Sequence, residues 1–146
     1  MNESTNIQEY DKDNVNQAEI KAKQLINDRV TVYEKDPSKA ERDEKLVREN
    51  LFQYVERLGK KIAKKLIDSI KFLFNAMTDP RTPFKAKVIA IAALVYFISP
   101  IDLIPDILPG GFADDAAAIA AAVASISIIL IQHGIHLEED KDQAKG

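Results

Sequence analysis

The sequence of 146 residues has no cysteine and no tryptophan, and it contains only five glycines. Because cysteine is absent, the chain has neither a disulfide framework nor a thiolate metal site. So few glycines argue against a loop-rich or all-β protein. Alanine, leucine, isoleucine, lysine and glutamate are abundant, and these residues favour helix. We therefore predict an all-α protein with about the length of one domain.

The sequence also lacks the motifs that carry much of enzymatic chemistry. It has no P-loop, dinucleotide fingerprint, nucleophile elbow or HExxH segment. The first residues, MNESTNIQEYDKDN, are polar and acidic, so they do not resemble a secretory signal. We identify no catalytic residue and no small-molecule substrate, and we favour a non-enzymatic role.

Two histidines, His133 and His136, stand three residues apart at the end of a predicted helix. This spacing suits two ligands of a metal ion. It also suits positive side chains at a helix C-terminus, where the helix dipole favours them. We expect the second role and keep metal binding as the alternative.

The net charge of −3 conceals a basic block at residues 57–87, which holds nine basic and two acidic side chains. Such a block is a candidate surface for anionic lipid, nucleic acid or an acidic protein partner. Arginine is scarce in it, with only Arg57 and Arg81. Because bidentate contacts to bases favour arginine, we rank nucleic acid low as a partner.

Composition and apolar spacing divide the chain into four parts. Residues 1–14 are polar and aperiodic, and we predict that they are disordered. Residues 15–79 form an amphipathic helical region, and residues 80–132 form an apolar helical hairpin. Residues 133–146 form a polar tail.

The second helix of the amphipathic region has a clear start. Pro37 ends a weaker helix before it, and Ser38 with Glu41 has the spacing of a capping box. Apolar residues then recur in steps of three and four, which indicates one long helix or two helices broken near Gly59. The stripe consists of Leu46, Val47, Leu51, Tyr54, Val55, Leu58, Ile62, Leu66, Ile70, Leu73 and Met77.

Five lysines lie opposite the second half of this stripe, on the same side as Arg57 and near Phe72. A cationic amphipathic helix is typical of proteins that lie on a membrane surface. It is equally the pattern of any solvated helix with one buried stripe. The candidate residues for binding lipid headgroups or an acidic partner are Lys60, Lys61, Lys64, Lys65 and Lys71.

Two apolar runs follow, at residues 88–98 and 116–131. A membrane-spanning helix needs about 20 apolar residues. The first run therefore reads as a buried helix or half of a re-entrant hairpin, and the second as a marginal transmembrane helix. Small residues recur at helical spacing in both, which lets two helices approach closely. These ridges are Ala86, Ala90 and Ala93 in the first run, and Ala116, Ala120 and Ala124 in the second. Thr82 is the expected N-cap of the first.

The connector between the runs is rich in proline and aspartate. Its motif residues are Ser99, Pro100, Asp102, Pro105, Asp106, Asp114 and Asp115. Each acid has a local role as a helix cap or at the positive end of a helix dipole. Alternatively the acids converge and bind Mg²⁺ or Ca²⁺, since carboxylate oxygens suit these ions. The spacing lacks the alternate-residue ligands of an EF-hand, so we expect capping and no bound cofactor.

The segment YFISPIDLIPDILPGGFADDAAAIAAAV resembles the YkvA-like family, domain of unknown function 1232. The resemblance rests on Ser-Pro-x-Asp-Leu-x-Pro-Asp, a Pro/Gly stretch, and an Asp-Asp pair at the head of a second apolar helix. It covers about residues 83–125. It implies a small, mostly bacterial protein associated with membranes, without an established activity. A similar segment occurs in a membrane-embedded RING ubiquitin ligase.

Three hypotheses follow. The first is a membrane-associated interaction or scaffolding protein whose hairpin enters the bilayer and whose lysines bind anionic headgroups. It places the chain at the cell membrane with its N-terminal region in the cytoplasm. The second is a soluble, cytoplasmic helical bundle that acts as an adaptor or regulator. The third is a hydrolytic or cation-binding protein that uses the aspartates. We favour the first.

Overall fold

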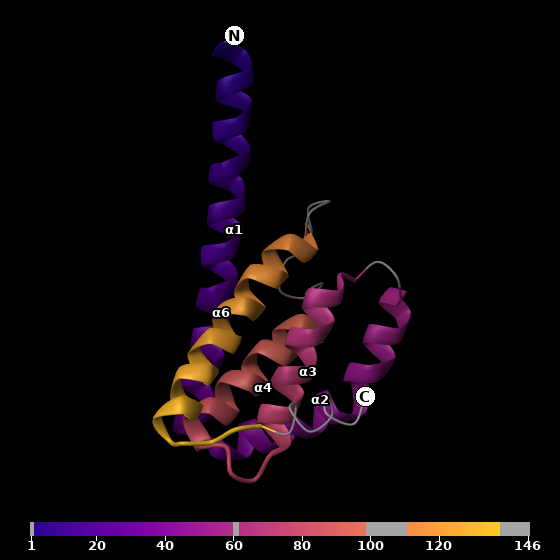
Figure 1. Cartoon of the computed structure of the whole chain (residues 1–146), viewed down its shortest axis with the longest axis vertical. Coiled ribbons are helices and arrows are strands. Elements are labelled where there is room, and N and C mark those ends of the chain that lie inside the picture. Colours follow the sequence, from indigo (N-terminus) through magenta and orange to yellow (C-terminus); the bar gives the residue numbers. More distant parts are fainter. Residues whose placement is uncertain (1, 60–61, 99–110, 138–146) are drawn as a thin grey trace.

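The computed structural model describes residues 2–59, 62–98 and 111–137. This part of the chain is built from five helices and no strands, which confirms the predicted all-α class (Figure 1). The helices are α1 (Asn2–Lys35), α2 (Pro37–Leu58), α3 (Lys64–Thr78), α4 (Phe84–Ile98) and α6 (Gly111–Gln132).

Helix α4 lies at the centre of the bundle. It contacts α1, α2, α3 and α6, and its residues 90–97 are each at most 3% exposed. A helix that is apolar on every side has no face for water, so it must be enclosed by others. The other helices each supply one apolar stripe to this enclosure, as Leu66, Ile70 and Leu73 do in α3.

The apolar stripe from Leu46 to Met77 lies on two helices, α2 and α3, rather than one, because the chain turns at Gly59. The φ angle of Gly59 is 56°, in the left-handed region that favours glycine. At the other end of α2, Asp36 is the N-cap and Pro37 occupies the first turn, so the prediction that Ser38 caps this helix is wrong. The side-chain hydrogen bond from Ser38 to Asp36 lowers the pKa of that carboxyl group.

Helix α1 begins at Asn2, earlier than the apolar pattern predicts. Among its described side chains, Ala22, Ile26, Val30 and Tyr33 are buried. The first 14 residues of the sequence have no apolar periodicity, so the sequence carries no such signal for a helix there. The side chains of residues 2–16 lie outside the described part of the structure.

Helix α6 turns a different set of alanines inward than the ridge predicted from the sequence. Ala118 and Ala122 are buried in the core together with Ile119 and Ile126, whereas Ala120 and Ala124 are exposed. The prediction is therefore wrong for Ala120 and Ala124, whereas Ala116, the first residue of that ridge, is half-buried against the core. The larger isoleucines decide which face is buried, because they have more apolar area to remove from water.

The end of α6 is tied to the loop before α4. Gly134, at φ 66°, lets the amide of Ile135 donate to the carbonyl of Leu130 at 2.9 Å. The chain then turns so that Arg81 donates to the carbonyl of His136 at 2.8 Å. The hydroxyl of neighbouring Thr82 is buried with no hydrogen-bond partner among the described residues. It therefore does not cap α4, and the prediction that Thr82 is the N-cap of this helix is wrong.

Candidate functional site

The outward side of α3 carries lysines that are free to meet a ligand. Lys64, Lys65 and Lys71 are exposed and form no ion pair within the described residues. Lys60 and Lys61, the other two predicted binding residues, lie outside the described residues. Because α3 begins at Lys64, Arg57 belongs to α2 and does not extend the same row.

The three basic residues at the C-terminal end of the block, Arg81, Lys85 and Lys87, are engaged in ion pairs instead. Lys85 contacts Glu34 of α1 at 2.9 Å, and Lys87 contacts Glu44 of α2 at 3.2 Å. Arg81 pairs with Asp79 at 2.8 Å, and its hydrogen bonds lower the pKa of that carboxyl group. The charge excess over residues 57–87 is thus divided, and among the described residues the unpaired basic side chains are Arg57 of α2 and the three lysines of α3.

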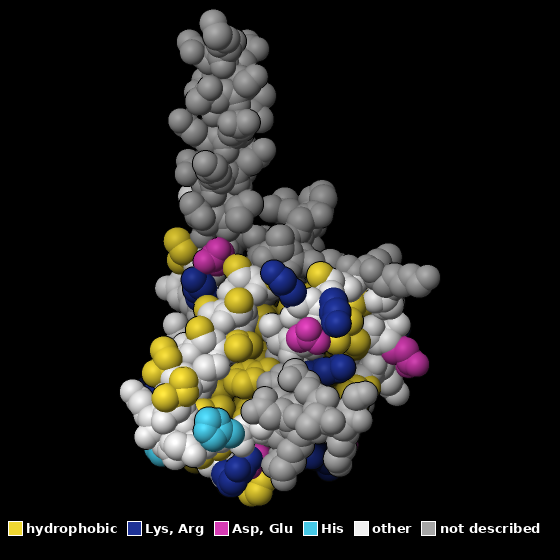
Figure 2. All heavy atoms as spheres, viewed as in Figure 1, with side chains coloured by type: hydrophobic (Ala, Val, Ile, Leu, Met, Phe, Trp, Pro, Cys, Tyr) yellow, Lys and Arg dark blue, Asp and Glu magenta, His cyan; other side chains and the backbone are white. Residues whose placement is uncertain are grey.

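The neighbouring helix α6 exposes apolar side chains of its own. Ile128 is 57% exposed and Ile131 is 73% exposed, and they continue the exposed line of Ala120 and Ala124. Helices α3 and α6 are in contact. One view shows hydrophobic side chains along α6 and Lys or Arg side chains gathered over α3 (Figure 2). We call this surface the α3–α6 face.

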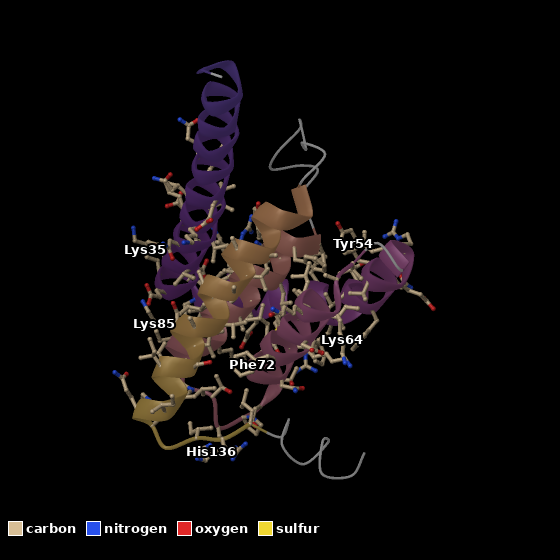
Figure 3. The ribbon with its side chains drawn as sticks, turned by 45° about the horizontal axis from the view of Figure 1, so that its top comes forward. Lys35, Tyr54, Lys64, Phe72, Lys85 and His136 are labelled. Atoms are coloured by element: carbon tan, nitrogen blue, oxygen red, sulfur yellow. The ribbon has the colours of Figure 1, made fainter. Side chains whose placement is uncertain are left out.

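Phe72 lies between α3 and α6. The sequence pattern placed it near the lysine side of α3 instead. Its side chain is half-buried and packs on the core. It lines a shallow pocket of about 200 Å³ with Leu130 and Ile131 of α6 and with Leu137 beyond it. Figure 3 shows Phe72 between the α3 and α6 ribbons, with Lys64 farther along α3. Phe72 thus packs α3 against the end of α6, where Ile131 is exposed.

An apolar groove lies on the other side of α3, against α2. It has a volume of about 410 Å³, and we call it the α2–α3 groove. Phe52 stands at its edge, 65% exposed, with its ring centroid 5.3 Å from that of Phe74 in an edge-to-face arrangement. The lining residues are Leu51, Phe52, Val55, Ile67, Ile70, Lys71, Phe74 and Asn75.

A polar cluster joins α1 to α2. The hydroxyl of Tyr33 donates to Asp43 at 2.5 Å, and Arg29 approaches the same oxygen at 3.4 Å. Burial above all, and then the hydrogen bond to Asp43, raise the pKa of Tyr33 above its usual range. The sequence reasoning missed this cluster, because no spacing motif connects residues on two different helices. Its contacts are internal, which fits a structural joint.

Among the described residues, no cluster of side chains suits a metal ion. No group of three histidine, aspartate or glutamate side chains is close enough there to hold an ion. His133 and His136 are exposed, and α6 ends at Gln132, so they do not share a helix face. The ring of His133 instead contacts the carbonyl of Ile129 at 2.9 Å.

Most of the aspartate connector falls outside the described residues, namely Ser99, Pro100, Asp102, Pro105 and Asp106. Asp114 and Asp115 belong to the first turns of α6, which begins at Gly111, and their side chains are not described. The choice between capping and cation binding at these positions stays a prediction.

No helix in the described part of the chain is long and apolar enough to cross a membrane. This includes α6, the segment in which the sequence suggested a marginal transmembrane helix.

Comparison with known proteins relates the central part of this structure to a family. Residues 86–121 match the model of a protein family of unknown function, DUF1232. The chain is also 38% identical over 69 residues to the "Uncharacterized membrane protein YkvA" of Bacillus subtilis (strain 168). That match covers 42% of this chain and 65% of the relative, so the chain spans less than two thirds of the relative it matches. No solved structure matches significantly. These matches confirm the resemblance to the YkvA-like DUF1232 family for this segment of the chain.

Proposed function

We propose that this chain is a non-enzymatic protein that binds the surface of an anionic membrane through its α3–α6 face. The observation that carries the proposal is the pairing of three unengaged lysines on α3 with two exposed isoleucines on the adjacent helix. Cationic and apolar side chains on one surface are the combination by which interfacial proteins bind headgroups and enter the acyl boundary. The relative's name, a membrane protein, supports the same reading.

The expected strength is modest and reversible. Each basic residue near an anionic surface contributes about 1 kcal/mol, so three lysines contribute roughly 3 kcal/mol. Full burial of an isoleucine contributes about 1.5–3 kcal/mol, and Ile128 and Ile131 would gain part of that. Ordering of the protein at the surface opposes these terms. Binding should therefore weaken strongly as salt rises, because the lysine contribution is screened.

The proposal also orients the protein. Anionic lipids are concentrated in the cytoplasmic leaflet, so the α3–α6 face would rest on that side of the cell membrane. Helix α1 would then extend into the cytoplasm. Its role there, as a scaffold or as a docking element for another protein, belongs to the same proposal.

Co-sedimentation with vesicles tests the function. The full chain should bind vesicles of phosphatidylglycerol and phosphatidylcholine, and should not bind vesicles of phosphatidylcholine alone. A variant with Lys64, Lys65 and Lys71 all changed to Gln should bind at least tenfold more weakly, because about 1 kcal/mol is lost at each position.

A matched control removes the same charge elsewhere, by changing Lys35, Lys39 and Lys85 to Gln. These lysines are exposed too, and Figure 3 shows Lys35 and Lys85 away from Lys64. The control should bind as the parent does. Equal loss in both triple variants would show that net charge, and not this face, attracts the chain, and the proposal would be abandoned.

One observation favours a second candidate, a helical adaptor that works away from membranes. Helices α1, α2, α3 and α6 cover α4, so the apolar core is already enclosed by the chain's own helices. In this case a protein partner occupies the α3–α6 face. A detergent-free monomer on gel filtration with no affinity for anionic vesicles would favour the adaptor.

A further inference from the structure

The α2–α3 groove has the character of a binding site for an amphiphile. Six of its eight lining side chains are apolar, and no carboxylate lines it. Its two polar groups, Lys71 and Asn75, are one α-helical turn apart on α3. Lys71 is exposed and unpaired among the described residues, so an apolar trough has a single free cation at its side.

We propose that this groove takes one acyl chain of an anionic membrane lipid, with the Lys71 ammonium group holding the headgroup. The inference rests on the proposed function, because Lys71 belongs to both surfaces. It is one of the three exposed lysines of α3, and it also lines the α2–α3 groove. A protein resting on a membrane through α3 would present the groove to the lipids beside it.

The shape of the groove favours a single acyl chain over a peptide. It extends on α3 from Ile67 to Asn75, which is about 12 Å at the rise of an α-helix. Its walls are helices whose backbone groups are already hydrogen-bonded, so an extended peptide has no edge to pair with. A docking helix has a diameter of about 10–12 Å and needs several anchor pockets along its length. An acyl chain needs neither backbone partners nor a wide trough.

The volume also fits. At about 410 Å³ the groove lies within the range of small-molecule sites, about 300–1,000 Å³. Phe52 and Phe74 stack edge to face along it, and Phe52 keeps most of its surface exposed. An exposed aromatic ring at the edge of an apolar groove favours an apolar ligand, since contact with the ligand removes a large area of the ring from water.

Calorimetry with a monomeric lipid tests the proposal. The probe is lysophosphatidylglycerol below its critical micelle concentration, with lysophosphatidylcholine as the neutral counterpart and dodecanoate as the free fatty acid. The full chain should bind lysophosphatidylglycerol with one site. It should bind lysophosphatidylcholine at least fivefold more weakly, because that headgroup has no net negative charge for Lys71.

Two variants locate the site. Phe52→Asp should weaken binding at least tenfold by placing a carboxylate at the groove edge, whereas Ile20→Asp, at a position 62% exposed on α1, should leave it unchanged. Lys71→Gln should lower affinity for lysophosphatidylglycerol and leave that for lysophosphatidylcholine unaltered. Both positions are exposed, so the fold should tolerate the changes, and circular dichroism checks this.

The outcomes separate this inference from the proposed function. Binding to anionic vesicles without binding to the monomeric probe overturns the groove assignment and leaves the membrane proposal standing. Probe binding that Phe52→Asp does not weaken also overturns it. Dodecanoate bound as tightly as lysophosphatidylglycerol would mean that free fatty acid, not membrane lipid, is the ligand. An Ile131→Asp variant that loses vesicle binding but keeps the probe would support both claims.

Discussion

Helices α4 and α6 are alike in sequence and unlike in place. Both are runs of alanine, isoleucine, leucine and valine, but α4 is enclosed by four helices while α6 keeps one side in water. Phe97 of α4 has no exposed surface, and Ile131 of α6 is 73% exposed. Apolar composition therefore measures how much surface a helix can bury, and neighbours decide how much it does bury.

The largest difference in stability between the two helices should appear when one large apolar side chain of each is truncated to alanine. Phe97→Ala should lower the free energy of unfolding by about 3–5 kcal/mol, because it leaves a cavity and removes the ring that Tyr54 meets at 5.2 Å. Ile131→Ala should change it by less than about 0.5 kcal/mol. Urea unfolding followed by circular dichroism measures both. Similar values for the two variants would contradict the placement of α6 at the surface.

Enlarging the alanines tests the same contrast in the opposite direction. Ala93→Leu in α4 should destabilise the protein by about 1–3 kcal/mol, since Ala93 has no exposed surface and its neighbours cannot yield. Ala124→Leu in α6 should be nearly neutral, because this position is exposed. Thermal melts of the two variants give the comparison. A large loss for Ala124→Leu would mean that this ridge is packed after all.

A pH series separates the apolar packing around α4 from the polar joint between α1 and α2. Tyr33 has a raised pKa in the folded state, so its contribution is complete below the unfolded value near 10 and is lost as pH rises above it. Tyr33→Phe should cost about 1 kcal/mol at neutral pH. It should also flatten the alkaline loss of stability relative to the parent. Parallel curves for parent and variant above pH 10 would show that this hydroxyl does not couple to folding.

The helical class and the break at Gly59 follow from local signals in the sequence. Low glycine content, apolar steps of three and four, and a glycine between two stripes are all short-range features. The buried side of α6 does not follow from such signals, because a helix that is apolar nearly all round has no preferred face until its partners are known.

Part of the candidate site could also be predicted from local signals, namely the exposed lysines of α3. Lys64, Lys65 and Lys71 stand opposite a strong stripe, so their exposure follows from helix geometry. Lys85 and Lys87 look identical to them in a charge count, but they pair with acids about fifty and forty residues away. The α2–α3 groove is likewise a product of two helices, and neither helix reveals it alone.

The central position of α4 bears on how the molecule holds together. The segment that matches the family model begins within α4 and includes the start of α6, yet α4 also rests on α1, α2 and α3. Residues 80–132 expressed alone would present most of α4 to solvent and should aggregate rather than fold. The bundle should therefore unfold as one cooperative unit. The shared family segment supplies its central helix, and that helix depends on the helices outside the segment to remain buried.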